Sequence, residues 1–229
     1  MSYAENYRGW KTADQINESM ARVYGHMGLA VLLSMVVSYF VSTNAGLMNF
    51  FFTGAMKWVT IFAPLVAIVA MSFALNSTTS KTTAQLMLYG FAALMGLSFA
   101  TIFIVYKIGS IMSAFGAGAI LFGVMSLWGY FTKTNLDSFG KFLFVGLIAL
   151  IIASIVNIFL GNSLFSMVIS AVAIIVFLGL TAYDTQKIRE MVSVNSDTGS
   201  SEVIGALTLY MDFINIFLAL LNLTGDKKE

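Results

Sequence analysis

Two aspartates lie in apolar surroundings near the end of the chain, and their spacing brings them to matching places. Asp184 lies 14 residues before residue 198, the centre of the polar stretch 194–202, and Asp212 lies 14 residues after it. Two antiparallel helices that leave a hairpin rise by the same ~1.5 Å per residue, so equal offsets give both carboxyl groups about the same depth. We therefore expect Asp184 and Asp212 to face each other.

Two carboxyl groups at one depth support two kinds of chemistry. Like charges repel and loss of water disfavours ionisation, so the pair can share one proton near neutral pH and act as a pH sensor or gate. Ionised, the same oxygens are ligands for a metal ion such as Ca²⁺, which takes roughly 6–8 oxygens. The alternative is a structural hydrogen bond between helices. Further oxygens could come from polar residues that would line a pore, although the sequence does not fix which of them do: Thr181, Thr208, Asn215 and Asn157.

The composition places these aspartates in a membrane. Of the 229 residues, 59% are hydrophobic and 10% are charged, and the mean hydropathy is +0.87, well outside the range of soluble proteins. Seven apolar runs are long enough as helices to cross a bilayer. The sequence therefore predicts an all-α integral membrane protein with seven transmembrane helices, at residues 23–42, 58–75, 85–106, 111–131, 139–161, 164–183 and 203–223.

The ends of these runs give the domain organisation. We expect a cytoplasmic N-terminal tail at 1–22, a single seven-helix bundle at 23–223 and a C-terminal tail at 224–229. The first 22 residues lack the short apolar core of a cleavable signal peptide. The absence of cysteine excludes thiol catalysis, disulfides and thiolate metal sites, and a net charge of +1 argues against a nucleic acid partner. The expected partner is the lipid bilayer, with no cofactor.

Lysine and arginine predict the orientation, because acidic residues contribute little to topology. Four basic residues fall on the side that carries the C-terminus: Lys57, Lys107, Lys227 and Lys228. Eight fall on the side of the N-terminus: Arg8, Lys11, Arg22, Lys81, Lys133, Lys141, Lys187 and Arg189. The asymmetry predicts a cytoplasmic N-terminus and a C-terminus outside. Asp184 then lies in the cytoplasmic half of the bundle, near an inner gate.

The last apolar run has a polar stripe. Small or polar residues recur at spacings that align them on one helical face: Ser201, Gly205, Thr208, Asp212, Asn215, Ala219 and Asn222. Such a stripe is costly against lipid, so it must face protein or a water-filled cavity. The pattern indicates that the last helix is central. The alternative is that the stripe only binds neighbouring helices through hydrogen bonds.

Two motifs around the aspartates resemble a known family. Residues 180–188 (LTAYDTQKI) and 205–217 (GALTLYMDFINIF) are similar to the C-terminal signature of the Bax inhibitor-1/YccA-like family, and its bacterial members are similar over the whole chain, including 156–161 (VNIFLG). The resemblance implies six helices surrounding a central seventh in the bacterial inner membrane. It also implies a pH-sensitive calcium leak channel gated by Asp184 and Asp212, with Ca²⁺ as the transported ion.

The chain departs from the family at one place, and two other functions compete with the channel. Some members carry a basic residue on the second helix that binds the aspartate on the sixth, but residues 64–77 contain no Lys or Arg. Family membership also suggests a non-conducting regulator of a membrane protease or a stress pathway. An intramembrane aspartyl protease would use two such carboxylates as acid and base. Its family, however, has Gly-x-Gly before the second aspartate, where this chain has LYM at 209–211. We therefore expect no enzymatic activity.

Overall fold

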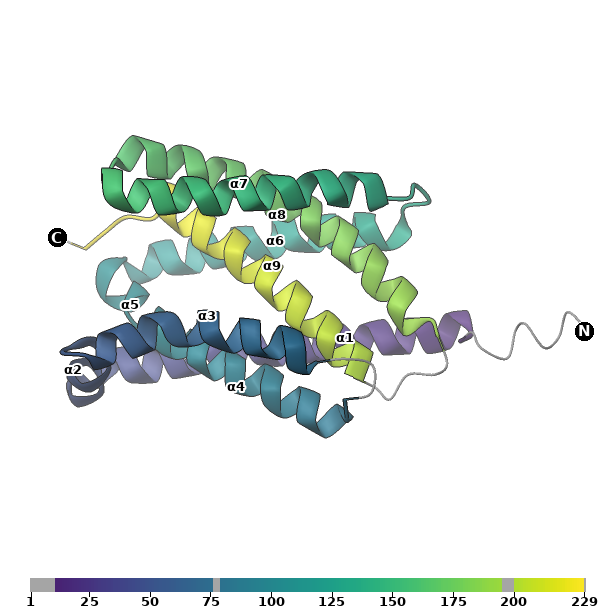
Figure 1. The fold of residues 1–229 in the computed structure, drawn as a ribbon, viewed down its shortest axis with the longest axis horizontal. Coiled ribbons are helices and arrows are strands. Elements are labelled where there is room, and N and C mark those ends of the chain that lie inside the picture. The colour runs from purple at the N-terminus through teal and green to yellow at the C-terminus, as the bar shows by residue number, and fades with distance from the viewer. Residues whose placement is uncertain (1–10, 76–78, 195–199, 229) are drawn as a thin grey trace, which may run out of the picture. The chain divides into compact units, whose positions relative to one another are not determined.

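The computed structural model describes residues 11–75, 79–194 and 200–228, and these are almost wholly helical (Figure 1). Within them, seven stretches are long and apolar enough to cross a membrane, which confirms the prediction of an all-α membrane protein with seven spans. One short helix that was not predicted, α2, follows the first span, and the predicted third helix, 85–106, is divided into α4 and the short α5. The helices are α1 (Ala13–Thr43), α2 (Ala45–Phe52), α3 (Met56–Ala74), α4 (Lys81–Phe99), α5 (Ile102–Val105), α6 (Ile108–Phe131), α7 (Asp137–Leu160), α8 (Ser163–Val192) and α9 (Ser200–Thr224).

Two helices extend beyond the apolar runs that predicted them. Helix α1 begins at Ala13, where the Gln15 backbone N–H donates to the Thr12 hydroxyl (3.4 Å) and the Thr12 N–H donates to the Gln15 side chain (2.8 Å). Part of the predicted tail is therefore helical, and Arg8 lies outside the described residues. Helix α8 continues to Val192. Hydropathy detects only the apolar centre of a helix, so polar ends supported by caps escape it.

The surface of the helices suits a hydrocarbon environment. Large apolar side chains are widely exposed, among them Phe73 (85%), Ile158 (78%) and Phe159 (85%). Soluble proteins rarely expose so many large apolar side chains. The spans α3, α6 and α7 have the fewest buried residues, with 11–22% of their most apolar stretch enclosed.

Helix α9 is the most enclosed span. In its most apolar stretch 67% of the residues are buried, against at most 33% in each of the other six spans of the described chain. This agrees with the polar stripe, which needs protein rather than lipid around it.

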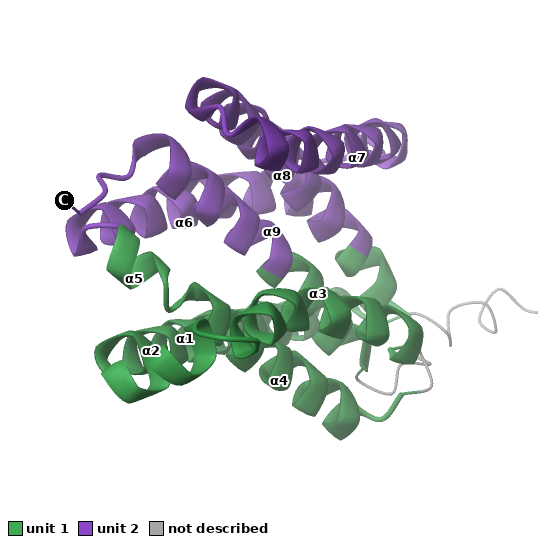
Figure 2. Ribbon diagram, turned by 60° about the vertical axis from the view of Figure 1, so that its left-hand side comes forward, with its two compact units in different colours: residues 1–105, 188–210 green, residues 106–187, 211–229 purple. Residues whose placement is uncertain are grey.

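The chain divides into two compact units (Figure 2). Unit 1 contains residues 1–105 and 188–210, and unit 2 contains residues 106–187 and 211–229. Helix α9 passes from unit 1 to unit 2 after Tyr210, and α8 passes from unit 2 to unit 1 after Lys187. The helices of each unit pack closely against one another. The prediction of a single bundle stays a prediction.

In unit 1, α1, α4 and α9 meet at a buried hydroxyl group. Ser34 on α1 donates to the backbone carbonyl of Ala92 on α4 (2.8 Å), and its Oγ lies 2.7 Å from the Tyr210 hydroxyl on α9. Gly96 on α4 lies so close to α1 that a Cβ there would stand 2.9 Å from the Cα of Ser34. Small residues thus allow these helices to approach, as is common in membranes.

In unit 2, the C-terminal tail pairs with the segment before α6. The backbone N–H of Lys107 donates to the Asp226 carbonyl (3.0 Å), and the Asp226 N–H donates to the Ser110 hydroxyl (3.0 Å). These bonds fasten the segment that follows α9 to the start of α6. Figure 1 shows α7 and α8 running antiparallel beside each other in the same unit.

Candidate functional site

The carboxyl groups of Asp184 on α8 and Asp212 on α9 meet inside unit 2, within hydrogen-bonding reach of each other. Asp212 is only 4% exposed, and its Oδ2 atom is buried without a hydrogen-bond partner. Asp184 is half-buried. A buried carboxyl oxygen without a donor is rare and costly, which makes this place unusual in the fold. The matching offsets in the sequence had indicated that the two groups face each other.

The antiparallel register of α8 and α9 brings the pair together. Within unit 1, a Cβ on Gly205 of α9 would stand 2.6 Å from the Ile188 side chain of α8. Within unit 2, the Asn222 side chain on α9 donates to the hydroxyl of Ser170 on α8 (2.8 Å). Asp184 and Asp212 fall between these contacts in the same register.

Helix α6 holds α8 at the level of the pair. Gly129 lies against the backbone of Ala182, and no side chain fits between them. The Ser126 hydroxyl lies 3.0 Å from the Thr185 hydroxyl. On the α9 side, the Phe213 ring packs edge-on against Phe122, with 5.8 Å between ring centroids. The residues beside the pair along the chain, Ala182 and Thr185 on α8 and Phe213 on α9, are therefore packed against α6.

Two polar side chains that follow Asp184 on α8, Gln186 and Lys187, bind the start of α7 and the loop before it. Lys187, three residues after Asp184, forms an ion pair with Asp137 at the start of α7 (2.5 Å). Gln186 accepts from the Leu136 N–H (2.9 Å) and donates to the Thr134 carbonyl (2.9 Å). These bonds tie the loop before α7 to α8. In the described part of the chain, neither Asp184 nor Asp212 forms an ion pair.

Three of the four predicted pore-lining residues lie within about one helical turn of an aspartate of the pair on the same helix. Thr181 lies three residues before Asp184 and donates its hydroxyl to the Phe177 carbonyl (2.7 Å). Asn215, three residues after Asp212, donates its amide to the Met211 carbonyl (2.7 Å), so its carbonyl oxygen remains an acceptor.

Thr208 and Asn157 differ in their relation to the pair. Thr208 lies one turn before Asp212 on α9 and bonds to the Ile204 carbonyl (3.2 Å). Asn157 lies 17 residues after Gly140 on α7, or about 25 Å along the helix. Because Gly140 packs against Tyr183, next to Asp184, Asn157 belongs to the opposite end of unit 2. The structure does not bring Asn157 to the pair.

The donor set suits a loosely held cation better than a permanent metal centre. Among the described residues, no third acidic or histidine side chain joins the two carboxyl groups. A tight calcium site needs more charged oxygens than two aspartates provide. Together with nearby hydroxyl, amide and backbone oxygens, the pair suits weak and transient binding of a cation.

Sequence reasoning missed one buried acid, Glu202 in the first turn of α9. It is 3% exposed and forms ion pairs with Arg22 and Lys81 within unit 1. In the sequence these three residues stand at the polar ends of three apolar runs. Nothing in their spacing indicates that they meet.

Comparison with known proteins identifies the family. The family model described as "Inhibitor of apoptosis-promoting Bax1" matches residues 16–229. The inner membrane protein YbhL of Escherichia coli (strain K12) is 40% identical over 216 residues, covering 91% of this chain and 92% of YbhL. A protein of Borreliella burgdorferi is 37% identical over 93% of this chain and 94% of its own. The protein RP147 of Rickettsia prowazekii is 37% identical over 96% of this chain and 94% of its own. The chain belongs to the Bax inhibitor-1 family.

Proposed function

We propose that the protein is a pH-sensitive cation leak channel, with Ca²⁺ as the ion, in which Asp184 and Asp212 form the gate. The observation that carries the proposal is the meeting of two carboxyl groups inside unit 2, with one oxygen of Asp212 buried and unbonded. Acidic residues inside membrane spans commonly mark ion or proton pathways. A purely structural pair would be expected to satisfy all its oxygens.

The gate works by competition between a proton and a cation for the same oxygens. When the pair shares a proton, the two carboxyl groups bind each other and the helices stay together. When both are ionised, they repel each other and present oxygens that suit Ca²⁺. Since neither forms an ion pair with a basic residue among those that the structure describes, a cation can take that place. The low exposure of Asp212 fits a closed state.

We further propose the location and orientation of the channel. The relative YbhL is described as an inner membrane protein, which supports the same membrane for this chain. The eight-to-four distribution of lysine and arginine supports a cytoplasmic N-terminus and a C-terminus outside. Asp137 and Lys187, which pair at one end of unit 2, then lie on the cytoplasmic side.

Calcium flux into liposomes that contain only the purified protein tests the proposal. We expect wild-type protein to admit Ca²⁺ in a pH-dependent way, and Asp184→Asn or Asp212→Asn to remove most of the pH dependence. The control is Asp14→Asn, the same chemical change at an exposed acid in the first turn of α1. Absence of flux at any pH would favour a non-conducting regulator of a membrane protease or stress pathway.

The proposal assigns no catalysis to the pair. An aspartyl protease needs both carboxyl groups open to water and to an extended peptide. The burial of Asp212 and the packing of Gly129 against Ala182 argue against that access. If the wild-type protein cleaved a transmembrane peptide in the same liposomes and both Asn variants did not, the result would contradict the channel proposal and favour an intramembrane protease.

A further inference from the structure

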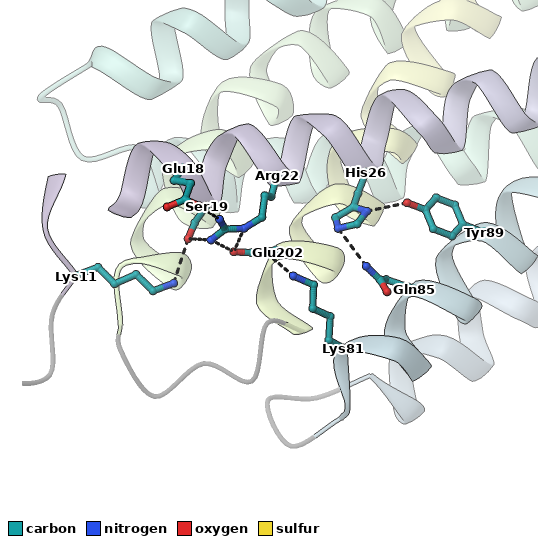
Figure 3. Close-up of polar contacts among 9 residues, drawn as sticks. All are labelled: Lys11, Glu18, Ser19, Arg22, His26, Lys81, Gln85, Tyr89 and Glu202. Carbon is teal, nitrogen blue, oxygen red and sulfur yellow. Dashed lines mark hydrogen bonds and ion pairs between the residues drawn. The ribbon is translucent and has the colours of Figure 1, made fainter. Parts of the chain in front are cut away.

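A second buried carboxyl group on α9 is held by cations from two other helices (Figure 3). Glu202 Oε1 accepts from Arg22 Nε (2.8 Å) and Arg22 Nη2 (2.7 Å) on α1. Glu202 Oε2 accepts from Lys81 Nζ at the first residue of α4 (3.2 Å). Both oxygens of Glu202 are thus paired, whereas Oδ2 of Asp212 has no hydrogen-bond partner. We call Glu202, Arg22 and Lys81 the Glu202 cluster.

Further bonds orient the arginine. Arg22 Nη1 donates to Glu18 on α1 (2.6 Å), and Nη2 donates to the Ser19 hydroxyl (3.1 Å). Lys11, just before α1, donates to the same hydroxyl (3.1 Å). The guanidinium plane is therefore fixed between an exposed acid on its own helix and the buried acid on α9.

The burial of Glu202 makes the cluster different from a surface ion pair. The Glu202 side chain is 4% exposed, whereas that of Glu18 is 70% exposed. An exposed pair contributes little, but removal of one partner from a buried pair leaves an uncompensated charge in the interior. The first turn of α9 also favours a negative charge, because the N-terminal end of a helix is electropositive. The cluster therefore depends on the charge of Glu202.

The cluster holds the same helix that carries the gate. Glu202 lies ten residues before Asp212 on the continuous helix α9, about 15 Å along its axis. The residues that follow Glu202 are buried in unit 1, among them Val203 and Ala206, both 0% exposed. A displacement of this first part of α9 moves the rest of the helix with it.

We propose that the Glu202 cluster positions α9 in the closed state, and that neutralising it releases the helix and raises the leak. The proposal rests on the channel function above. Its physical basis is that the two ion pairs of Glu202 hold the first turn of α9 to α1 and α4, and that the same continuous helix carries Asp212. The cluster then adds to the energy needed to move α9 away from α1 and α4. Arg22 and Glu202 are positioning residues, since neither touches the ion.

Three variants and one matched control test the cluster. Glu202→Gln removes the buried charge, Arg22→Gln removes its main partner, and Lys81→Gln removes the longer and more exposed contact. The control Glu18→Gln removes a charge from the other side of the same guanidinium without touching α9. We expect a roughly tenfold higher Ca²⁺ flux for Glu202→Gln and Arg22→Gln at neutral pH, which corresponds to about 1.4 kcal/mol. Lys81→Gln should give a smaller increase, and Glu18→Gln none.

A second measurement follows α9 without relying on flux. Since the chain has no cysteine, Ala206→Cys gives a single thiol on the buried face of α9. A water-soluble maleimide should label this thiol slowly in the parent and at least several times faster with Glu202→Gln. If Glu202→Gln fails to fold, Lys81→Gln carries the same comparison. The combination Glu202→Gln with Arg22→Gln should add little to Glu202→Gln alone, because both changes remove the same Arg22–Glu202 ion pair.

The outcomes separate the positioning of α9 from the channel function. Faster labelling and higher flux together support both. Faster labelling with no flux in any protein, wild type included, would overturn the channel and keep the positioning role. Unchanged labelling and flux in folded Glu202→Gln, with only a lower melting temperature, would overturn the inference and make the cluster structural.

Discussion

Gly129 on α6 lies directly against the backbone of Ala182 on α8, two residues before Asp184. A Cβ at Gly129 would stand 2.7 Å from the Cα of Ala182, closer than real atoms approach. The contact therefore fixes how near α8 can come to α6, and with it the place of the Asp184 carboxyl group.

Substitution of Gly129 by alanine should destabilise the protein. The added methyl group must push α8 away, and such overpacking costs about 1–3 kcal/mol. The measurement is the apparent melting temperature of purified protein in detergent, which should fall by several degrees. Gly123→Ala is the matched control on the same helix, because nothing lies within 4 Å of its Cβ position. Equal melting temperatures for the two variants would contradict the close contact.

The two aspartates should act as one group in the pH response. A proton shared by Asp184 and Asp212 belongs to both, so Asp184→Asn and Asp212→Asn should each remove most of it. The double variant should then add little. The readout is the pH profile of Ca²⁺ flux, normalised to the amount of folded protein. If the two single effects add up in the double variant, the carboxyl groups titrate independently.

Acidification should weaken Ca²⁺ binding at the pair. Protons and Ca²⁺ compete for the same oxygens, so a lower pH leaves fewer ionised carboxylates to bind the ion. We expect wild-type flux, where binding limits it, to fall as the pH is lowered from about 8 to about 5. Asp212→Asn should flatten this response. A flat wild-type profile, or an intact one in Asp212→Asn, would remove the pair as the sensor.

The C-terminus should lie outside the cytoplasm. Seven spans and the excess of lysine and arginine on the N-terminal side predict this orientation. A reporter that is active only in the cytoplasm, fused after Glu229, should be silent, and the same reporter fused before Met1 should be active. Activity at the C-terminus would overturn the N-inside orientation.

The sequence predicts the membrane spans well because a membrane demands long apolar helices. It predicts the meeting of Asp184 and Asp212 because a hairpin constrains two neighbouring helices. It does not predict that α1 begins at Ala13, because the Thr12 cap lies in a polar stretch. It also does not predict the Glu202 cluster. Arg22 and Glu202 are 180 residues apart, and a contact over that distance depends on tertiary packing that no local pattern records.

The depth of Asn157 in the membrane likewise depends on tertiary packing, which the local sequence does not record. A polar residue in an apolar run is a candidate for a pore, and this role for Asn157 stays a prediction. The register of α7 against α8, which Gly140 and Tyr183 fix, decides its depth instead. Residue type indicates that a side chain needs a partner, but only packing determines which one.

The enclosure of α9 has a consequence for how the protein is made. Helix α9 follows α1 to α8 in the chain and is synthesised after them, and it carries two buried acids, Glu202 and Asp212, that a bilayer alone would accommodate poorly. Their partners, Arg22, Lys81 and Asp184, all belong to earlier segments of the chain. The order of synthesis therefore lets the most polar face enter the membrane after its binding partners are in place. A truncated chain that stops before Ser200 would leave those partners without the helix that completes them.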